Sequence, residues 1–264
     1  MDLGLNGKIA VVSGSTAGIG FAIANTLAVE GAQVIVNGRT QARVNSALEK
    51  LRKYVPNADI RGIAADLSSA SGVQTFTKEA PEADILINNL GIFEPKPFAE
   101  IPDADWQRFF DVNVMSGVRL SRHYLPGMLR KDWGRIIFIS SESGQQTPVE
   151  MIHYGMTKTA QIAIARGLAE SVAGTRITVN SILVGPTDSE GVGNFVEDLA
   201  RQQGISKVEF EKQFFASVRP TSLLKRFETP EEVAAVVAFV ASVQAATING
   251  TAVRAEGGVV RSIF

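Results

Sequence analysis

Short apolar runs recur along the chain, separated by longer mixed segments. Within the runs, apolar and polar residues do not alternate, and this unbroken pattern is typical of strands that helices cover on both faces. The runs span residues 9–12, 34–36, 60–64, 85–87, 136–139, 177–179 and, more weakly, 251–253. The sequence therefore predicts seven buried strands.

Between these runs lie stretches whose apolar residues are three to four positions apart, which is the spacing of an amphipathic helix. Examples span residues 19–28, 44–51, 162–172 and 233–240. Strands and helices that alternate along the whole chain predict an α/β fold. We expect a doubly wound, seven-stranded parallel sheet with helices on both faces.

The chain shows no linker, repeat or low-complexity segment, so we expect a single domain over residues 1–264. Residues 91–102 carry three prolines and predict a loop. The alternation of strands and helices breaks between residues 184 and 229. We interpret residues 188–228 as a lid of one or two short helices over a binding site.

Composition and charge narrow the function. A formal net charge of −1 and a pI near 6.2 give no attraction to nucleic acid or to an anionic membrane. The absence of cysteine excludes disulfides and thiolate chemistry, and two histidines do not favour a metal site. The N-terminus lacks the features of a secretory signal, and no run reaches the roughly 20 apolar residues that span a bilayer. We expect a cytoplasmic protein with no nucleic-acid or membrane partner and no metal.

A glycine-rich loop follows the first predicted strand and opens a helix. Gly14 permits a tight turn, Gly18 lets the backbone approach a pyrophosphate, and Gly20 lets the helix pack closely on the strand. The helix N-terminus adds free N–H groups that attract phosphate. A glycine-rich turn without a ligand is the alternative, but the place between strand and helix favours a dinucleotide. The residues expected to contact it are Gly14, Ser15, Thr16, Gly18, Ile19 and Gly20.

The end of the second predicted strand bears on which dinucleotide binds. An NAD site places an acidic residue there, which accepts hydrogen bonds from the adenosine ribose. This chain has Gly38 followed by Arg39, so no carboxylate repels a 2′-phosphate and a guanidinium can pair with one. We predict a preference for NADP(H), with NAD(H) as the alternative. The competing interpretation of Arg39 is a solvated charge at a helix start, and Ala17 lacks the basic residue of some NADP enzymes.

With these motifs the chain resembles the short-chain dehydrogenase/reductase family from about residue 6 to 258. The glycine loop has the family's GxxxGxG spacing, and Asn88-Asn89-Leu90-Gly91 is similar to its Asn-Asn-Ala-Gly motif, with leucine in place of alanine. Tyr154-Gly155-Met156-Thr157-Lys158 is similar to its YxxxK motif. That motif alone is weak, whereas the ordered set is specific. The resemblance implies a Rossmann-type fold and an NAD(P)-dependent oxidoreductase.

The resemblance also implies roles for single residues. It implies that the dinucleotide is contacted by Asp66, Leu67, Asn89, Gly91, Tyr154, Lys158, Thr187 and Ser189. The implied catalytic residues are Asn113, Ser141, Tyr154 and Lys158, with Asn113 holding a water that links Lys158 to solvent. The chain departs from the family at Val184, where a proline is usual, and at Glu256, where an aspartate is usual.

The Tyr154–Lys158 pair suits proton transfer to a carbonyl oxygen that receives a hydride. The two residues are four apart on a predicted helix and therefore share a face. A free phenol has a pKa near 10, and we expect the ammonium of Lys158, together with the positive nicotinamide ring when it is oxidised, to lower the pKa of Tyr154. Ser141 then holds the substrate oxygen, and Tyr154 is general acid in reduction and general base in oxidation. His153 points elsewhere on the helix and is interpreted as a pocket-edge or packing residue.

The substrate stays open at this level. We expect a small carbonyl or alcohol. Aromatic residues at helical spacing more often pack in the core than contact a substrate, but if the lid aromatics face the site they favour a partly apolar substrate; they are Phe195, Phe210, Phe214 and Phe215. Gln145, Gln146, Met151 and Ile152 should also line the pocket. A 3-oxoacyl thioester reductase would need a basic patch for its carrier protein, for which the candidates are Arg130, Lys131 and Arg176. Sugar, polyol or steroid-type dehydrogenases are equally open, and a catalytically idle nucleotide-binding protein is the alternative outside enzymes.

The resemblance further implies a homotetramer, packed through the helices after the fourth and fifth strands and through the C-terminal region. The apolar segment 234–241 and the tail ending Ile263-Phe264 suit such buried contacts.

Overall fold

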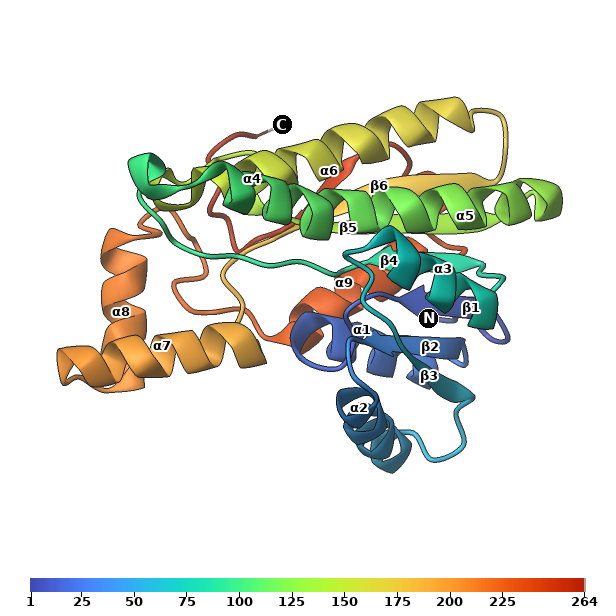
Figure 1. Ribbon diagram of the computed structural model, residues 1–264, viewed down its shortest axis with the longest axis horizontal. Helices are drawn as coiled ribbons and strands as arrows, with labels where there is room; N and C mark the ends of the chain where they lie inside the picture. Colours follow the sequence, from blue (N-terminus) through green and yellow to red (C-terminus); the bar gives the residue numbers. More distant parts are fainter. Residues whose placement is uncertain (264) are drawn as a thin grey trace.

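The computed structural model describes residues 1–263, apart from the side chains of Asn194 and Phe195. One parallel sheet crosses the molecule, with the strand order β3-β2-β1-β4-β5-β6-β7 (Figure 1). The strands are β1 (Ile9–Val12), β2 (Gln33–Gly38), β3 (Ile60–Ala64), β4 (Ile85–Asn88), β5 (Gly134–Ser141), β6 (Ile177–Val184) and β7 (Ala252–Ala255). All six strand pairs are parallel. The predicted seven-stranded, doubly wound sheet is confirmed.

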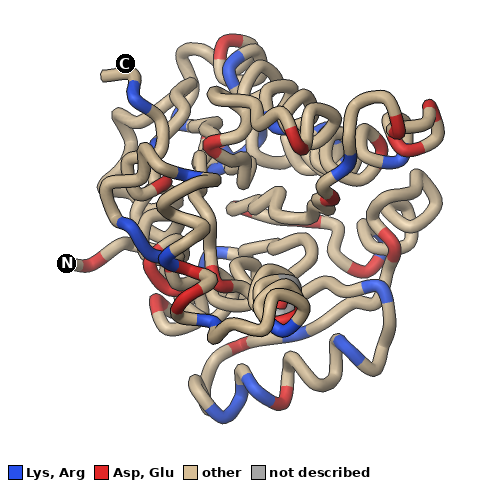
Figure 2. The backbone as a smooth tube through the Cα atoms, turned by 90° about the vertical axis from the view of Figure 1, so that its left-hand side faces the viewer, with Lys and Arg blue, Asp and Glu red and all other residues tan. Residues whose placement is uncertain are grey.

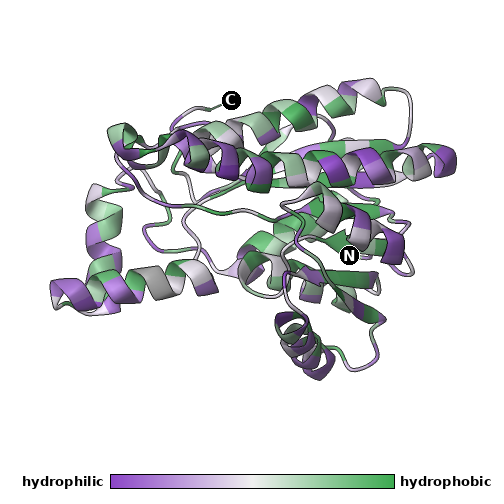
Figure 3. Cartoon of the chain, in the orientation of Figure 1, coloured by the Kyte–Doolittle hydropathy of each residue, from purple (hydrophilic) through white to green (hydrophobic). Residues whose placement is uncertain are grey.

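Helices cover both faces of this sheet. On one face lie α1 (Gly18–Val29), α2 (Gln41–Tyr54) and α9 (Pro230–Ala241); on the other lie α3 (Ala70–Glu79), α5 (Ser116–Lys131) and α6 (Ile152–Ser171). The remaining helices are α4 (Asp103–Phe110), α7 (Glu190–Gln203) and α8 (Lys207–Ser217). Shorter turns are η1 (Phe98–Glu100), η2 (Asp111–Met115), η3 (Glu142–Gly144) and η4 (Val149–Met151). Figure 3 shows the strands and the inner helix faces as the hydrophobic part of the molecule.

Two strands exceed the length that the apolar pattern predicts by the largest margin. β5 and β6 each run eight residues, and every residue in both is buried. Their unpredicted parts carry Ser140, Ser141, Asn180 and Ser181, so polar side chains conceal where these strands end. The polar residues at the carboxyl end of β5 belong to the site described below.

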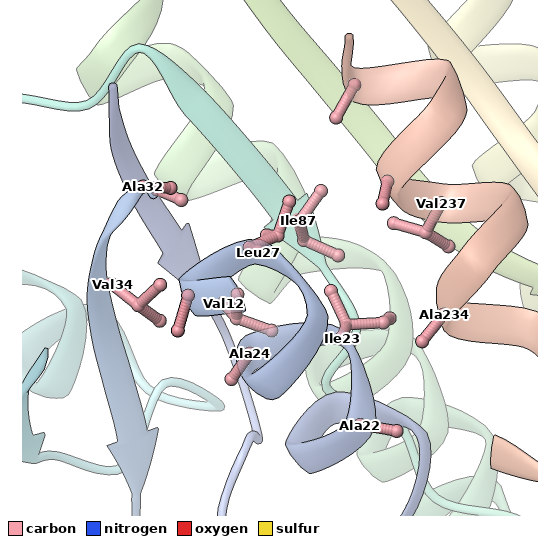
Figure 4. Packing of buried hydrophobic residues seen from close by; sticks show 14 of the residues in the cluster. Val12, Ala22, Ile23, Ala24, Leu27, Ala32, Val34, Ile87, Ala234 and Val237 are labelled. Carbon is pink, nitrogen blue, oxygen red and sulfur yellow. The ribbon is translucent and has the colours of Figure 1, made fainter. Parts of the chain in front are cut away.

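The core forms two layers, one on each face of the sheet. Val12 faces the layer with α1 and α9, and its neighbour Val11 faces the layer with α3, α5 and α6, because successive strand residues point to opposite faces. In Figure 4, Ile23 of α1 lies towards Ala234 and Val237 of α9. The apolar segment 234–241, expected to pack between subunits, is therefore largely used inside the monomer. The end of the expected C-terminal contact, Phe264, lies outside the described residues.

The topology places a crevice at one edge of the sheet. β1 pairs with β2 on one side and with β4 on the other. At this point the direction in which successive strands are added to the sheet reverses. Ligands bind such sheets at the carboxyl ends of the strands, at the point of reversal. Helices α7 and α8 project beyond this edge (Figure 1). They occupy the predicted lid segment but are longer than the short helices expected there, at 14 and 11 residues.

The charged residues are dispersed over the fold. Figure 2 shows Lys and Arg interspersed with Asp and Glu along the chain trace. Among the described residues, no helix combines the length and the apolar character that crossing a membrane requires.

Candidate active site

A cavity of about 880 Å³ opens at the carboxyl ends of the strands. Its walls come from the glycine loop, the ends of β2, β4, β5 and β6, the start of α6, and helices α7 and α8. Residues from distant parts of the sequence meet here because all parallel strands end at the same edge of the sheet. The cavity is therefore the candidate active site.

The glycine loop is held in place by two asparagines at neighbouring strand ends. Asn37 accepts the N–H of Gly14 at 3.1 Å, and the side chain of Asn89 donates to the carbonyls of Ser13 and Gly14, each at 3.0 Å. A methyl group on Gly20 would lie 2.5 Å from both Asn89 Nδ2 and Gly14 O, so only glycine fits there. Helix α1 then begins at Gly18, whose φ of +56° also favours glycine.

This cradle fits a dinucleotide. Backbone at a loop and helix start forms one wall, which Gly14, Gly18 and Gly20 line. Most residues expected to bind the dinucleotide line the cavity: Gly14, Thr16, Gly18, Ile19, Gly20, Arg39, Leu67, Asn89, Gly91, Tyr154, Lys158, Thr187 and Ser189. Ser189 faces the loop directly, since a methyl group on Gly18 would lie 3.1 Å from its Cβ.

Ser15 and Asp66 lie elsewhere than expected. Ser15 is fully buried, its hydroxyl donates to Val12 O at 2.6 Å, and its N–H donates to Asn37 O at 2.9 Å. Because both donors are used inside the protein, Ser15 shapes the loop and does not line the cavity. Asp66 is exposed and accepts from the N–H and hydroxyl of Ser68, so it stands outside the lining that its neighbour Leu67 joins.

The adenosine end of the cavity carries two arginines. Arg39, directly after β2, is exposed and forms no ion pair with any described residue. Arg43, one helical turn further on α2, donates to Glu190 at the start of α7 at 2.9 Å. Sequence reasoning missed both members of this pair, because they are 147 residues apart. The pair joins the coenzyme side of the cavity to the predicted lid.

The structure brings Ser141, Tyr154 and Lys158 together at the other end of the cavity. Ser141 ends β5, and Tyr154 and Lys158 lie one turn apart near the start of α6. Ser141 lies close enough to Tyr154 to act on the pKa of its phenol. Lys158 Nζ lies 5.5 Å from the centre of the Tyr154 ring and donates to Ile139 O at 2.8 Å. The neighbouring Ser140 instead donates to Lys158 O at 2.9 Å, which separates its role from that of Ser141.

The expected acidity of the phenol is not supplied by the protein's own groups. Burial raises the pKa of Tyr154, the carboxylate of Glu142 raises it further, and the nearby Ser141 only partly offsets this. Burial also lowers the pKa of Lys158 to about 8. Tyr154 therefore keeps its proton at neutral pH, and the lowering of its pKa by Lys158 together with an oxidised nicotinamide ring stays a prediction.

Asn113 lies in η2, close to Lys158. Its Oδ1 accepts the N–H of Ile92 at 2.8 Å, and its Nδ2 donates to Ile92 O and to Thr157 Oγ1, each at 3.0 Å. A methyl group on Gly91 would lie 3.5 Å from Asn113 Oδ1 and 3.6 Å from Lys158 Nζ, so both atoms face this glycine. The side chain thus fixes the loop after β4 beside Lys158, and its part in a water relay stays a prediction.

His153 packs in the core beside the site. It is fully buried, and its ring lies 4.1 Å from that of Phe109, between centroids. Burial lowers its pKa, and neither ring nitrogen has a hydrogen-bond partner among the described residues. Its interpretation as a packing residue fits these contacts, since it does not line the cavity.

The substrate end of the cavity holds an ion cluster that sequence reasoning missed. Glu142, directly after Ser141, is 5% exposed and accepts the Nε of Arg219 at 3.0 Å. Arg219 follows α8 and also donates to Glu150 Oε1 at 3.0 Å. The one sign of this cluster in the sequence is a glutamate directly after the end of a buried strand. We call Glu142, Glu150 and Arg219 the ion cluster.

The lid aromatics divide between packing and lining. Phe210 and Phe214 line the cavity, whereas Phe215 packs against Phe214 and Phe227. The side chain of Phe195 lies outside the described residues. Of the four residues expected to line the pocket between Ser141 and Tyr154, Met151 does so, and Gln145, Gln146 and Ile152 do not.

The turn after β6 completes the wall. Thr187 is buried and forms a parallel bridge with Glu228, and Gly185 N donates to the carboxyl of Glu228 at 3.2 Å. A glutamate from the far end of the lid segment thus supports the turn that lacks the usual proline at Val184.

Comparison with known proteins decides the class of this site. The pattern of short chain dehydrogenases matches residues 8–200, which include the glycine loop and the Tyr154–Lys158 pair. The chain belongs to the short-chain dehydrogenase family. This dehydrogenase is an NAD(P)-dependent oxidoreductase, as its resemblance implied.

Relatives and solved structures cover the whole dehydrogenase. It is 47% identical over 264 residues to the uncharacterized oxidoreductase YvaG of Bacillus subtilis, covering 100% of both chains. It is 32% identical to a D-beta-hydroxybutyrate dehydrogenase of Cupriavidus necator, covering 96% of this chain and 98% of the relative. The crystal structure of L-sorbose reductase from Gluconobacter frateurii, complexed with NADPH and L-sorbose, superposes with a TM-score of 0.94 at 30% identity and 100% coverage of both chains. These relatives favour an enzyme over the idle binding protein.

Proposed function

We propose that the protein transfers a hydride between NADP(H) and a small carbonyl or secondary alcohol, with Tyr154 as general acid and base. The observation that carries this proposal is the meeting of Ser141, Tyr154 and Lys158 in the cavity that the glycine loop closes at its other end. The bound dinucleotide supplies or accepts the hydride. The protein supplies the position of the substrate oxygen and one proton.

The protonation states fit the direction of reduction. Because burial and Glu142 raise the pKa of Tyr154, the phenol holds a proton that it can donate to a carbonyl oxygen at neutral pH. Lys158, with a pKa of about 8, is mostly charged at that pH and stabilises the phenolate left behind. Oxidation of an alcohol needs the phenolate first, so it should be faster in alkaline solution.

The coenzyme preference rests on the end of β2. No acidic side chain follows this strand, and Arg39 forms no ion pair with a described residue, so it can pair with a 2′-phosphate. Arg43 lies on the same helix start, although Glu190 shares it. That L-sorbose reductase is complexed with NADPH supports the same preference.

The contacts of the candidate basic residues argue against a 3-oxoacyl thioester reductase that docks a carrier protein. Lys131 pairs with Glu82 and Asp84, and Arg176 pairs with Asp132, so of the three candidate cations only Arg130 forms no ion pair with a described residue. They also lie at the end of α5 and just before β6, at the amino edge of the sheet, whereas the cavity lies at the carboxyl edge. A small free carbonyl compound fits the site better than an acyl group on a docked carrier.

A homotetramer is the proposed assembly. The family resemblance supports it, and Phe239 and Val243 remain 38% and 40% exposed beside the C-terminal region. Light scattering at micromolar concentration should report four chains, and a monomer would contradict the proposal.

The function is tested with a panel of ketones, aldehydes and alcohols and with both coenzymes, read as nicotinamide absorbance. We expect turnover with NADPH and a neutral ketone, and a kcat/KM for NADPH above that for NADH. Uptake of neither coenzyme, or binding without any turnover over the panel, would contradict the proposed function.

A further inference from the structure

The ion cluster stands where the substrate must bind. Glu142 lines the cavity next to Ser141, and its charge acts directly on Tyr154 by raising the pKa of that phenol. A carboxylate beside a forming alkoxide is unfavourable unless it has another task, because like charges repel. The hydrogen bonds of Glu142 indicate what that task is.

The carboxylate of Glu142 accepts hydrogen bonds from several groups of the protein. Its Oε1 accepts from Arg219, and its Oε2 accepts from Ser143 N at 2.8 Å, from Ser143 Oγ at 3.0 Å and from the hydroxyl of Ser141. The proton of Ser141 is thus directed at Glu142 and not into the cavity. A serine hydroxyl has one proton and therefore one donor bond.

Substrate binding requires this proton to move. When Ser141 donates to the substrate's carbonyl oxygen, it must release Glu142, whose Oε2 then keeps Ser143 N and Ser143 Oγ but loses its third donor. A hydrogen bond to a charged group contributes about 1.5–3 kcal/mol, so the carboxylate favours a replacement for the lost donor. A hydroxyl on the carbon next to the carbonyl would replace the lost donor, because it stands beside the oxygen that Ser141 holds.

The charges of the cluster work against an anionic substrate. Of the charged residues that line the catalytic end of the cavity, Glu142 and Glu150 share one guanidinium, Arg219. The other cation there, Lys158, is bonded to Ile139 O. Beside Ser141, a substrate carboxylate would face two like charges that share a single guanidinium.

We propose that Glu142 accepts a hydrogen bond from a hydroxyl adjacent to the reacting carbonyl, so that the enzyme prefers neutral α-hydroxy carbonyl compounds over plain ketones and over oxo acids. This deepens the proposed function and rests on it. Arg219 positions Glu142 for this role and brings in the end of α8, so the lid segment contributes to the choice of substrate.

Three substrates that differ in one group test this inference. Hydroxyacetone, butanone and acetoacetate carry a hydroxyl, a methyl group and a carboxylate on the same carbon. For the wild type with NADPH, we expect kcat/KM for hydroxyacetone to exceed that for butanone by about 10- to 100-fold, with acetoacetate slowest. Equal values for hydroxyacetone and butanone, or a preference for acetoacetate, would overturn the inference.

The variant Glu142→Gln keeps the shape and removes the charge. Since hydrogen bonds to a charged acceptor are about twice as strong as neutral ones, the preference for hydroxyacetone should fall by at least about fivefold. The control Glu150→Gln takes a carboxylate from the same arginine without touching Ser141, and it should keep the ratio. If Glu142→Gln does not fold, Glu142→Asp, which withdraws the carboxylate from Ser141, should lower the same ratio. An unchanged ratio in a folded Glu142 variant would refute the role.

A pH profile separates this role from a structural one. Glu142 raises the pKa of Tyr154, so Glu142→Gln should move the rise of alcohol oxidation to lower pH. A purely structural glutamate would leave that profile in place, and this outcome would count against the inference. No turnover of any of the three substrates by the wild type, despite coenzyme binding, would instead indicate failure of the proposed function.

Discussion

The two ends of the cavity are formed by different kinds of chemical groups. At the coenzyme end, backbone atoms of the glycine loop form the wall, and the neutral side chains of Asn37 and Asn89 hold them. At the substrate end, side-chain charges are buried: Glu142 is 5% exposed, and Arg219 has 11% of its side chain exposed. The first end recognises what all dinucleotides share, and the second can discriminate between substrates.

This difference has a physical basis. Helix N–H groups and glycine backbone bind phosphate regardless of what the rest of the ligand carries. A buried carboxylate or guanidinium is costly unless each of its partners is in place, so it rejects ligands that leave it unpaired. Mutations at the coenzyme end should therefore change coenzyme binding. Mutations at the substrate end should change the rate and the choice of substrate.

Among the variants that compare the two ends, the largest effect is expected at the substrate end, for Lys158→Met. Methionine fits the buried stem but removes the cation that stabilises the Tyr154 phenolate, so kcat should fall about 100- to 1000-fold, within the roughly 100- to 10,000-fold range of general acid–base catalysis. Coenzyme affinity should change far less. Steady-state kinetics and a coenzyme fluorescence titration measure both, with the exposed Lys50→Met as control. If Lys158→Met lost only coenzyme affinity, this would contradict the assignment of coenzyme binding to one end of the cavity and of rate to the other.

At the coenzyme end, Arg39→Asp should change selectivity more than rate. A carboxylate in place of the guanidinium repels a 2′-phosphate, so kcat/KM with NADPH should fall about 10- to 100-fold relative to NADH. The matched charge reversal Arg52→Asp, on the exposed face of α2, should leave the coenzyme ratio unchanged. An unaltered ratio of kcat/KM for NADPH and NADH in Arg39→Asp would show that this arginine does not bind the 2′-phosphate.

The smallest effect is expected on stability, at the turn that joins the two ends. Burial raises the pKa of Glu228 from 4.5 to about 7, so the folded protein holds a proton there that the unfolded chain releases. Stability from this group is full below pH 4.5 and is lost as the pH rises to about 7. Glu228→Gln should therefore be more stable than wild type at pH 8 by about 1–3 kcal/mol, and much less so at pH 5.

Urea unfolding at both pH values measures this difference. The exposed Glu231→Gln on α9 is the control, since it replaces a carboxyl group that stays solvated. A stability gain that is the same at pH 5 and pH 8 would show that the charge of Glu228 is not its cause.

At both ends of the cavity, the sequence predicts the parts that are local in the chain better than the contacts between distant segments. The glycine loop and its helix are continuous in the chain, and Tyr154 and Lys158 are one turn apart, so spacing alone gives their geometry. Arg219 and Glu142 are 77 residues apart, and Arg43 and Glu190 are 147 apart. Such pairs leave no periodic signal, and only the folded sheet brings them together.

Burial is the second property that spacing does not give. Ser15 reads as a loop residue that meets the ligand, yet it faces the interior and bonds to Val12. Likewise, the spacing of Tyr154 and Lys158 suggests an acidic phenol, whereas the depth of the site raises the pKa of that phenol. The strands and most helices follow from apolar periodicity, since this pattern reports burial directly.

The central claim is that Tyr154 passes a proton to the substrate in a site whose coenzyme end is built independently. The most direct test is Tyr154→Phe, studied by NADPH titration and by turnover of a neutral ketone. We predict a kcat lower by at least about 1000-fold with a coenzyme Kd within about threefold of wild type. A phenylalanine variant that keeps full turnover would contradict the account.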